Sequence, residues 1–184
     1  MRRAEWCNLA NAVTSVRVAL APVLVYLLAR GLYECALWTF LVAGLSDALD
    51  GFVARHLHQL TRFGATLDPI ADKLVIVSSV VALAVRDLLP LWLVLVIVAR
   101  DVVIVAGALG FRLRYGHLEM APLPAGKACT FTQISLILLV LFQAASWLDV
   151  SAWLPALHVL TAAAAVVSGV QYVAVWGAKA LRQP

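Results

Sequence analysis

The sequence has few charged residues and few cysteines, and both shortages exclude common classes of protein. Lysine, arginine, aspartate and glutamate make up 13% of the 184 residues, whereas hydrophobic residues make up 64%. The mean hydropathy of +0.95 lies far above the range of soluble domains. The three cysteines, Cys7, Cys35 and Cys129, form no CxxC pair, so neither a zinc site nor a disulfide framework is indicated. The composition therefore predicts an integral membrane protein.

Long apolar runs divide the chain into six segments, each close to the roughly 20 residues that a helix needs to cross a bilayer. The expected transmembrane helices span residues 11–30, 34–57, 62–86, 90–113, 122–146 and 151–178. Residues 2–9 mix charged side chains with Trp6 and Leu9, which is typical of a short helix on the membrane interface. No long linker interrupts the pattern, so residues 1–184 are expected to form a single all-α membrane domain.

Basic residues near the ends of the expected helices lie mostly on one side of the membrane. An even number of spans places both termini on the same side, and the loops after the second and fourth helices join them there. That side collects Arg2, Arg3, Arg55, Arg62, Arg112, Arg114, Lys127, Lys179 and Arg182, whereas Arg30 and Arg86 remain opposite. By the positive-inside rule, the basic side faces the cytoplasm, and a bacterial inner membrane is the expected location.

Four aspartates interrupt the second and third expected helices. Asp47 and Asp50 are three residues apart, so they share one face of their helix. Asp68 and Asp72 are four residues apart and share a face in the same way. Both pairs lie at a similar distance from the turn near residues 57–61, which predicts one carboxylate cluster just inside the cytoplasmic face. Such a cluster needs neutralisation, and oxygen ligands favour Mg²⁺ or Mn²⁺, with room for two ions.

Small residues and an arginine accompany these aspartates. Gly51, Ala54 and Gly64 leave space for a ligand to approach the backbone, and Arg55 is placed to meet a phosphate. The alternative for each of them is close helix packing with an Asp–Arg pair. His56 and His58 are expected in the neighbouring loop as solvated residues, with a metal or proton-relay role as the alternative.

Together these residues form the pattern D47-x2-D50-G51-x2-A54-R55-x8-G64-x3-D68-x3-D72, which resembles the complete signature of the CDP-alcohol phosphatidyltransferase family. The resemblance extends from NLANAVTSVR to the last expected helix, and the six-helix arrangement is similar to the family's fold. It implies that all four aspartates bind metal ions and that Asp72 is also the general base. It implies a set of CDP-lipid-binding residues as well: Asn11, Thr14, Asp50, Gly51, Ala54, Arg55 and Gly64. Ala10 departs from the proline that is usual before this asparagine.

The implied reaction transfers a phosphatidyl group from CDP-diacylglycerol to an acceptor hydroxyl and releases CMP. Asp72 would deprotonate the hydroxyl, which then attacks the lipid-proximal (β) phosphorus while the metal ions stabilise the charge. The resemblance also makes a homodimer the expected assembly.

A second set of basic residues indicates an anionic acceptor. The set consists of Arg17, Arg100, Arg112, Arg114 and Lys127. A basic pocket favours glycerol-3-phosphate, inositol phosphate or the phosphate of phosphatidylglycerol over uncharged acceptors. For Arg100, a local structural pair with the neighbouring Asp101 is the alternative.

Three segments narrow the choice of acceptor by resemblance. AGLSDALDGFVAR, RFGATLDPIADKL and RDVVIVAGALGFRLRYG are similar to the CDP-diacylglycerol-using cardiolipin synthases within the family. This favours phosphatidylglycerol as the acceptor and cardiolipin as the product. Glycerol-3-phosphate, which would give phosphatidylglycerophosphate, is the alternative.

Carboxylates in membrane helices also occur in cation-coupled transporters, which form the main rival class. The expected cluster lies near one face rather than at the midplane, and no inverted repeat of broken helices is visible. A structural scaffold would only be destabilised by four buried carboxylates. The basic residues line a membrane face without an accompanying soluble domain, so no nucleic-acid partner is expected.

Overall fold

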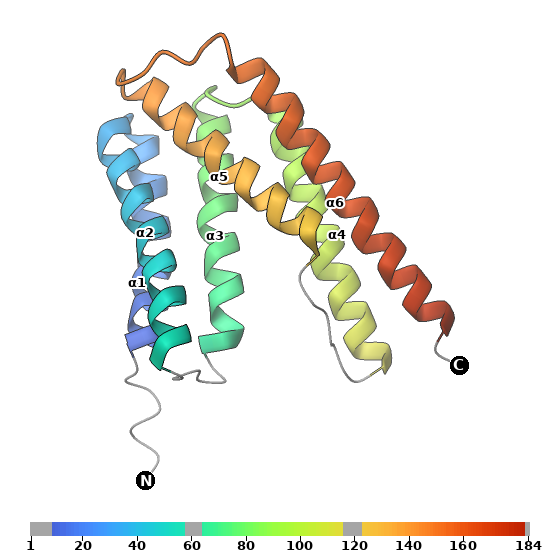
Figure 1. Ribbon diagram of the computed structural model, residues 1–184. Helices are drawn as coiled ribbons and strands as arrows, with labels where there is room; N and C mark the ends of the chain where they lie inside the picture. Colours follow the sequence, from blue (N-terminus) through green and yellow to red (C-terminus); the bar gives the residue numbers. More distant parts are fainter. Residues whose placement is uncertain (1–8, 58–63, 116–122, 183–184) are drawn as a thin grey trace. The chain divides into compact units, whose positions relative to one another are not determined.

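The computed structural model describes residues 9–57, 64–115 and 123–182, with side chains placed in residues 19–45, 73–110 and 123–178 and at Leu113. Within these ranges all regular structure is helical, which confirms the predicted all-α fold. The helices are α1 (Leu9–Ala29), α2 (Tyr33–Leu57), α3 (Gly64–Val85), α4 (Leu91–Tyr115), α5 (Pro124–Ala144) and α6 (Leu154–Arg182) (Figure 1). The expected interfacial helix falls on residues 2–8, outside the described residues, apart from Leu9, which begins α1.

Three of these helices end in the same kind of left-handed turn. Gly31, Asp87 and Ser146 have φ angles of 72°, 57° and 60°. In each turn the left-handed residue donates its N–H to the carbonyl three residues back, and the next residue donates to the carbonyl five residues before it. After α1, for example, Gly31 donates to Leu28 and Leu32 donates to Leu27, at 3.0 and 2.9 Å. This pattern is the Schellman motif, which satisfies carbonyls at a helix end with backbone donors.

The chain forms two compact units. The first contains Met1–Leu88 and Val140–Asp149, and the second contains Leu89–Leu139 and Val150–Pro184. In the first unit α1 packs against both α2 and α3, and in the second α4 packs against α6 (Figure 1). Leucine, isoleucine and valine fill both cores; fully buried examples are Leu24, Leu28, Leu37 and Leu83 in the first unit and Leu93, Ile97, Leu136 and Ile137 in the second. The single domain expected over residues 1–184 stays a prediction.

Among the described residues, three helical segments are long and apolar enough to cross a membrane. They are Leu91–Gly110, Pro124–Ala144 and Leu154–Ala178. Shorter apolar helical segments cover Ala19–Ala29, Tyr33–Leu45 and Lys73–Val85. Large apolar side chains are exposed on α4 and α6, including Leu95, Val102, Val166 and Val170. Exposed apolar surface on such helices supports membrane association, whereas the six-span topology stays a prediction.

Candidate functional site

The predicted metal ligands lie on two consecutive helices of the first unit. Helix α2 is continuous from Tyr33 to Leu57 and carries Asp47 and Asp50. Helix α3 carries Asp68 and Asp72 within its first three turns. Residues three or four apart on an unbroken helix share a face, so the helical spacing expected within each pair is present. The side chains of residues 46–72 lie outside those described, and their metal-binding and catalytic roles stay predictions.

The predicted CDP-lipid ligands belong to the same unit. Gly51, Ala54 and Arg55 lie near the end of α2, and Gly64 is the first residue of α3. Asn11 and Thr14 lie in the first half of α1, the helix against which both α2 and α3 pack. Arg17, a predicted acceptor ligand, lies on the same helix. The first unit therefore contains every residue that the sequence assigns to metal or CDP-lipid binding.

The aspartate-bearing helices have two further features near their ends, of which the position of His56 differs from the expectation. His56 belongs to α2 rather than to a loop, because the helix continues to Leu57, and His58 lies outside the described residues. Pro69 is the sixth residue of α3 and lies inside the helix, beyond its first turn. Its ring nitrogen has no hydrogen to donate to the carbonyl of Ala65, so this carbonyl lacks its usual helical partner.

The donor chemistry of the aspartate pairs fits a hard divalent cation. Carboxylates and a backbone carbonyl without its helical donor are oxygen ligands of the kind that Mg²⁺ and Mn²⁺ prefer. Among the side chains that the structure describes, no three histidine, cysteine, aspartate or glutamate residues gather at one point.

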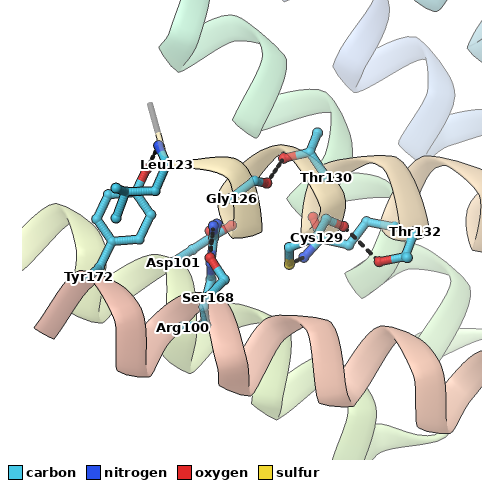
Figure 2. Close-up of polar contacts among 10 residues, drawn as sticks. Arg100, Asp101, Leu123, Gly126, Cys129, Thr130, Thr132, Ser168 and Tyr172 are labelled. Carbon is cyan, nitrogen blue, oxygen red and sulfur yellow. Dashed lines mark hydrogen bonds and ion pairs between the residues drawn. The ribbon is translucent and has the colours of Figure 1, made fainter. Parts of the chain in front are cut away.

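A buried ion pair lies in the second unit, at the contact of α4 with α6 (Figure 2). Arg100 and Asp101 are each only 9% exposed. Arg100 Nη1 donates to Asp101 Oδ1 at 2.6 Å. Arg100 Nε and Nη2 both donate to the hydroxyl of Ser168 on α6, at 3.2 and 2.6 Å. The local Arg–Asp pair that the sequence left open as an alternative is therefore present, with a buried serine as its second partner.

Tyr172 connects this pair to the start of α5 (Figure 2). It lies one turn after Ser168 on α6, and its ring centroid is 5.9 Å from the Arg100 guanidinium carbon. Its hydroxyl accepts a hydrogen bond from the N–H of Leu123 at 3.5 Å. A Cβ added to Gly126 would lie 3.2 Å from the same hydroxyl oxygen and 3.5 Å from Arg100 Nη2. The tyrosine therefore packs directly on the backbone at the beginning of α5.

The remaining predicted acceptor ligands lie close to this connection in the sequence. Lys127, the fourth residue of α5, is exposed, and in the described part of the chain its side chain makes no hydrogen bond or ion pair. Arg112 and Arg114 lie in the last turn of α4, with side chains outside those described. Two predicted acceptor ligands, Arg100 and Lys127, thus lie near each other, because Arg100 lies next to Gly126, the residue before Lys127.

Sequence reasoning missed Ser168 and Tyr172 as members of this cluster. The available signal was the spacing of four residues between them, which places a hydroxyl and an aromatic ring on one face of α6.

Comparison with known proteins points to one family. Residues 7–175 match the profile of the CDP-alcohol phosphatidyltransferase family. A cardiolipin synthase (CMP-forming) of Streptomyces coelicolor is 36% identical over 145 residues, which cover 75% of this chain and 67% of that protein. A probable phosphatidylglycerophosphate synthase of Mycobacterium tuberculosis is 34% identical over 185 aligned residues, which cover 94% of this chain and 83% of that protein. The resemblance inferred from the signature is thereby confirmed.

Human cardiolipin synthase (CMP-forming) is 42% identical over 109 residues, which cover 59% of this chain. The match covers 36% of the human protein, so the chain spans only about a third of the length of that relative. The relatives thus include both a cardiolipin synthase and a probable phosphatidylglycerophosphate synthase, the two activities that the sequence leaves open.

Proposed function

Because the chain belongs to the CDP-alcohol phosphatidyltransferase family, we propose that it transfers a phosphatidyl group from CDP-diacylglycerol to an anionic glycerol-type acceptor and releases CMP. The observation that carries this proposal is the complete eight-residue signature, set at helical spacing on the continuous helices α2 and α3. Phosphatidylglycerol is the proposed acceptor and cardiolipin the proposed product. The second candidate is glycerol-3-phosphate, supported by the 34% identity to a probable phosphatidylglycerophosphate synthase over 94% of this chain.

The four aspartates are the proposed metal ligands. Asp47 and Asp50 on α2 would act with Asp68 and Asp72 on α3 to hold one or two Mg²⁺ or Mn²⁺ ions. When bound, such ions stabilise the negative charge that develops on the diphosphate. The carboxylates in turn require the ions, because four uncompensated charges in an apolar chain would repel one another.

Asp72 is the proposed general base. Its carboxylate takes the proton from the acceptor hydroxyl, whose oxygen then forms a bond to the lipid-proximal (β) phosphorus. The bond from this phosphorus to the bridging oxygen breaks, and CMP departs with that oxygen. Gly51 and Ala54 leave room for the cytidine diphosphate, Gly64, Asn11 and Thr14 contact it, and Arg55 binds a phosphate.

Lys127 is the leading candidate for binding the acceptor's negative charge. It is exposed and carries no partner in the described part of the chain. Arg17, Arg112 and Arg114 are proposed to share this role through their positive charge. Arg100 would contribute less by direct contact, because three of its N–H groups already point to Asp101 and Ser168.

The proposed setting is a bacterial inner membrane with six spans, both termini and the active site on the cytoplasmic side, and a homodimer as the assembly. Support comes from the apolar segments on all six described helices and from the basic residues near the ends of the expected spans. A lipid substrate presents its diphosphate at the interface, where the aspartates are expected.

The first experiment is an assay of the full chain in liposomes that contain CDP-diacylglycerol and Mg²⁺ or Mn²⁺. Phosphatidylglycerol and glycerol-3-phosphate are supplied separately, while CMP release and lipid products are measured by mass spectrometry. Cardiolipin from phosphatidylglycerol is the expected product. Formation of phosphatidylglycerophosphate instead would support the proposed reaction but identify glycerol-3-phosphate as the acceptor. Absence of CMP release with either acceptor would refute the proposal.

A binding measurement separates the enzyme from a cation-coupled transporter. A cytidine nucleotide should raise the melting temperature only when Mg²⁺ or Mn²⁺ is also present, because metal and nucleotide would share the site. A transporter that carries only the cation has no reason to show this joint dependence. EDTA should abolish both the nucleotide-induced shift and CMP release.

A further inference from the structure

The contact of Tyr172 with the start of α5 has a specific consequence for acceptor binding. We infer that Tyr172 is a positioning residue, which holds the first turn of α5 so that Lys127 meets the phosphate of an anionic acceptor. This inference rests on the proposed function, since it assigns a task to a residue of the proposed acceptor site. Tyr172 itself would not touch the acceptor.

The backbone of Leu123 is the connection between the tyrosine and the lysine. The N–H of Leu123 donates to the Tyr172 hydroxyl at 3.5 Å. The carbonyl of Leu123 accepts from the N–H of Gly126 at 3.0 Å and from the N–H of Lys127 at 3.3 Å. Leu123 therefore binds Tyr172 through its N–H and the backbone of Lys127 through its carbonyl.

The same Tyr172 hydroxyl makes a second contact with this turn, at Gly126. A Cβ at this position would lie 3.2 Å from the hydroxyl oxygen and 3.3 Å from the ring carbon Cε2 of Tyr172. Both distances are tighter than ordinary van der Waals contact, so a Cβ at residue 126 would require the ring to move by a few tenths of an ångström.

The ring of Tyr172 is in turn held by buried neighbours. The Arg100 guanidinium carbon lies 5.9 Å from the ring centroid, and the ring of Trp176 lies 5.7 Å away, centroid to centroid. Arg100 is fixed by its ion pair with Asp101 and by its two hydrogen bonds to Ser168. The start of α5 is thus attached to the buried contact between α4 and α6.

A defined kinetic effect follows from this arrangement. A small displacement of the first turn of α5 moves the point from which the lysine side chain extends, which weakens its contact with a phosphate. The metal ligands and the CDP-lipid ligands lie on other helices, α1 to α3. Loosening the turn should therefore raise the KM for the acceptor and leave the KM for CDP-diacylglycerol and kcat nearly unchanged.

The test is the Tyr172→Phe variant of the full chain in liposomes, measured with whichever anionic acceptor supports CMP release by the unchanged protein. The KM for that acceptor should rise about fivefold, the factor that one ordinary hydrogen bond contributes. The matched control is Tyr33→Phe, which removes a hydroxyl that accepts from Arg86 Nε at 3.3 Å in the first unit. That control should leave the acceptor KM within twofold.

A second variant, Gly126→Ala, disturbs the same contact from the other side and should raise the same KM. Because both changes break one connection, the double variant should show a smaller effect than the product of the two single effects. A lower kcat with an unchanged acceptor KM in all three variants would indicate simple destabilisation and would overturn the positioning role.

Hydrogen exchange supplies a readout that does not depend on activity. The amides of Leu123, Gly126 and Lys127 should exchange faster in Tyr172→Phe than in the unchanged protein, and should not change in Tyr33→Phe. Unchanged exchange would refute the connection itself. Faster exchange with an unchanged acceptor KM would refute its role in acceptor binding, whereas an inactive unchanged protein would instead refute the proposed function.

Discussion

The two compact units differ in whether their charged residues are balanced by residues of opposite charge. In the second unit, the buried Arg100 has a carboxylate beside it at 2.6 Å and a buried serine on the facing helix, so its charge is balanced within the structure. In the first unit, residues 47–72 contain four aspartates but only two arginines. A charge that is balanced by its own neighbour indicates a structural role, whereas an excess of one sign at helical spacing indicates a ligand of the opposite sign.

The strongest test of this comparison is Asp72→Asn in the first unit. The amide keeps the shape of the side chain but cannot accept the proton, so CMP release should fall at least tenfold while binding of the CDP-lipid stays measurable. Initial rates in liposomes and thermal shifts with a cytidine nucleotide provide the two readouts. A variant that retains more than a tenth of the activity would contradict the assignment of the base.

The matched control for this change is Asp87→Asn. It also removes one carboxylate, but from an exposed turn where asparagine tolerates the left-handed backbone. Activity should stay close to that of the unchanged protein.

The second test is Asp101→Asn, which leaves the buried guanidinium of Arg100 without its counter-charge. Removing one partner of a buried pair costs about 3 kcal/mol, so the melting temperature in detergent should fall clearly. Adding Arg100→Gln removes the unpaired charge and should recover most of the loss. If the double variant stayed as unstable as the single one, the charge balance would not be what stabilises this contact.

The third and smallest effect concerns the packing of α4 on α6. A Cβ on Gly107 would overlap the ring of Trp176, which is only 8% exposed. Gly107→Ala should therefore destabilise the second unit by about 2 kcal/mol. Gly110→Ala on the same helix is the control: nothing lies within 4 Å of its Cβ position, and alanine is the better helix former. Equal melting temperatures for the two variants would disprove the close contact.

The sequence predicted the helices well because hydrophobic runs and turn residues mark the same boundaries. The expected helix over residues 34–57 corresponds to α2 (Tyr33–Leu57), and the one over 11–30 corresponds to α1 (Leu9–Ala29). The last helix was expected to end at residue 178 but continues to Arg182. Hydropathy marks where an apolar run ends, whereas backbone hydrogen bonds can extend a helix through polar residues beyond it.

The candidate site was predictable where it depends on spacing within one helix. The Arg100–Asp101 pair is of this kind and is present. The two aspartate pairs lie at the expected helical spacing, and their metal-binding role stays a prediction. The hydrogen bonds from Arg100 to Ser168 join residues 68 positions apart, and the Tyr172 contact with Leu123 joins residues 49 apart. Such partners depend on how α4, α5 and α6 pack, and no local pattern in the sequence specifies that packing.

The left-handed turns after α1, α3 and α5 bear on how these helix ends are hydrated. A carbonyl at the end of a helix normally takes its hydrogen bond from water. At Gly31, Asp87 and Ser146, the chain itself supplies N–H donors to two carbonyls of the last turn. In the proposed membrane topology, such turns at the water-poor edge of the bilayer would leave fewer backbone groups to dehydrate. An apolar helix that ends this way can stop close to the hydrocarbon boundary without a polar extension that carries its end into bulk water.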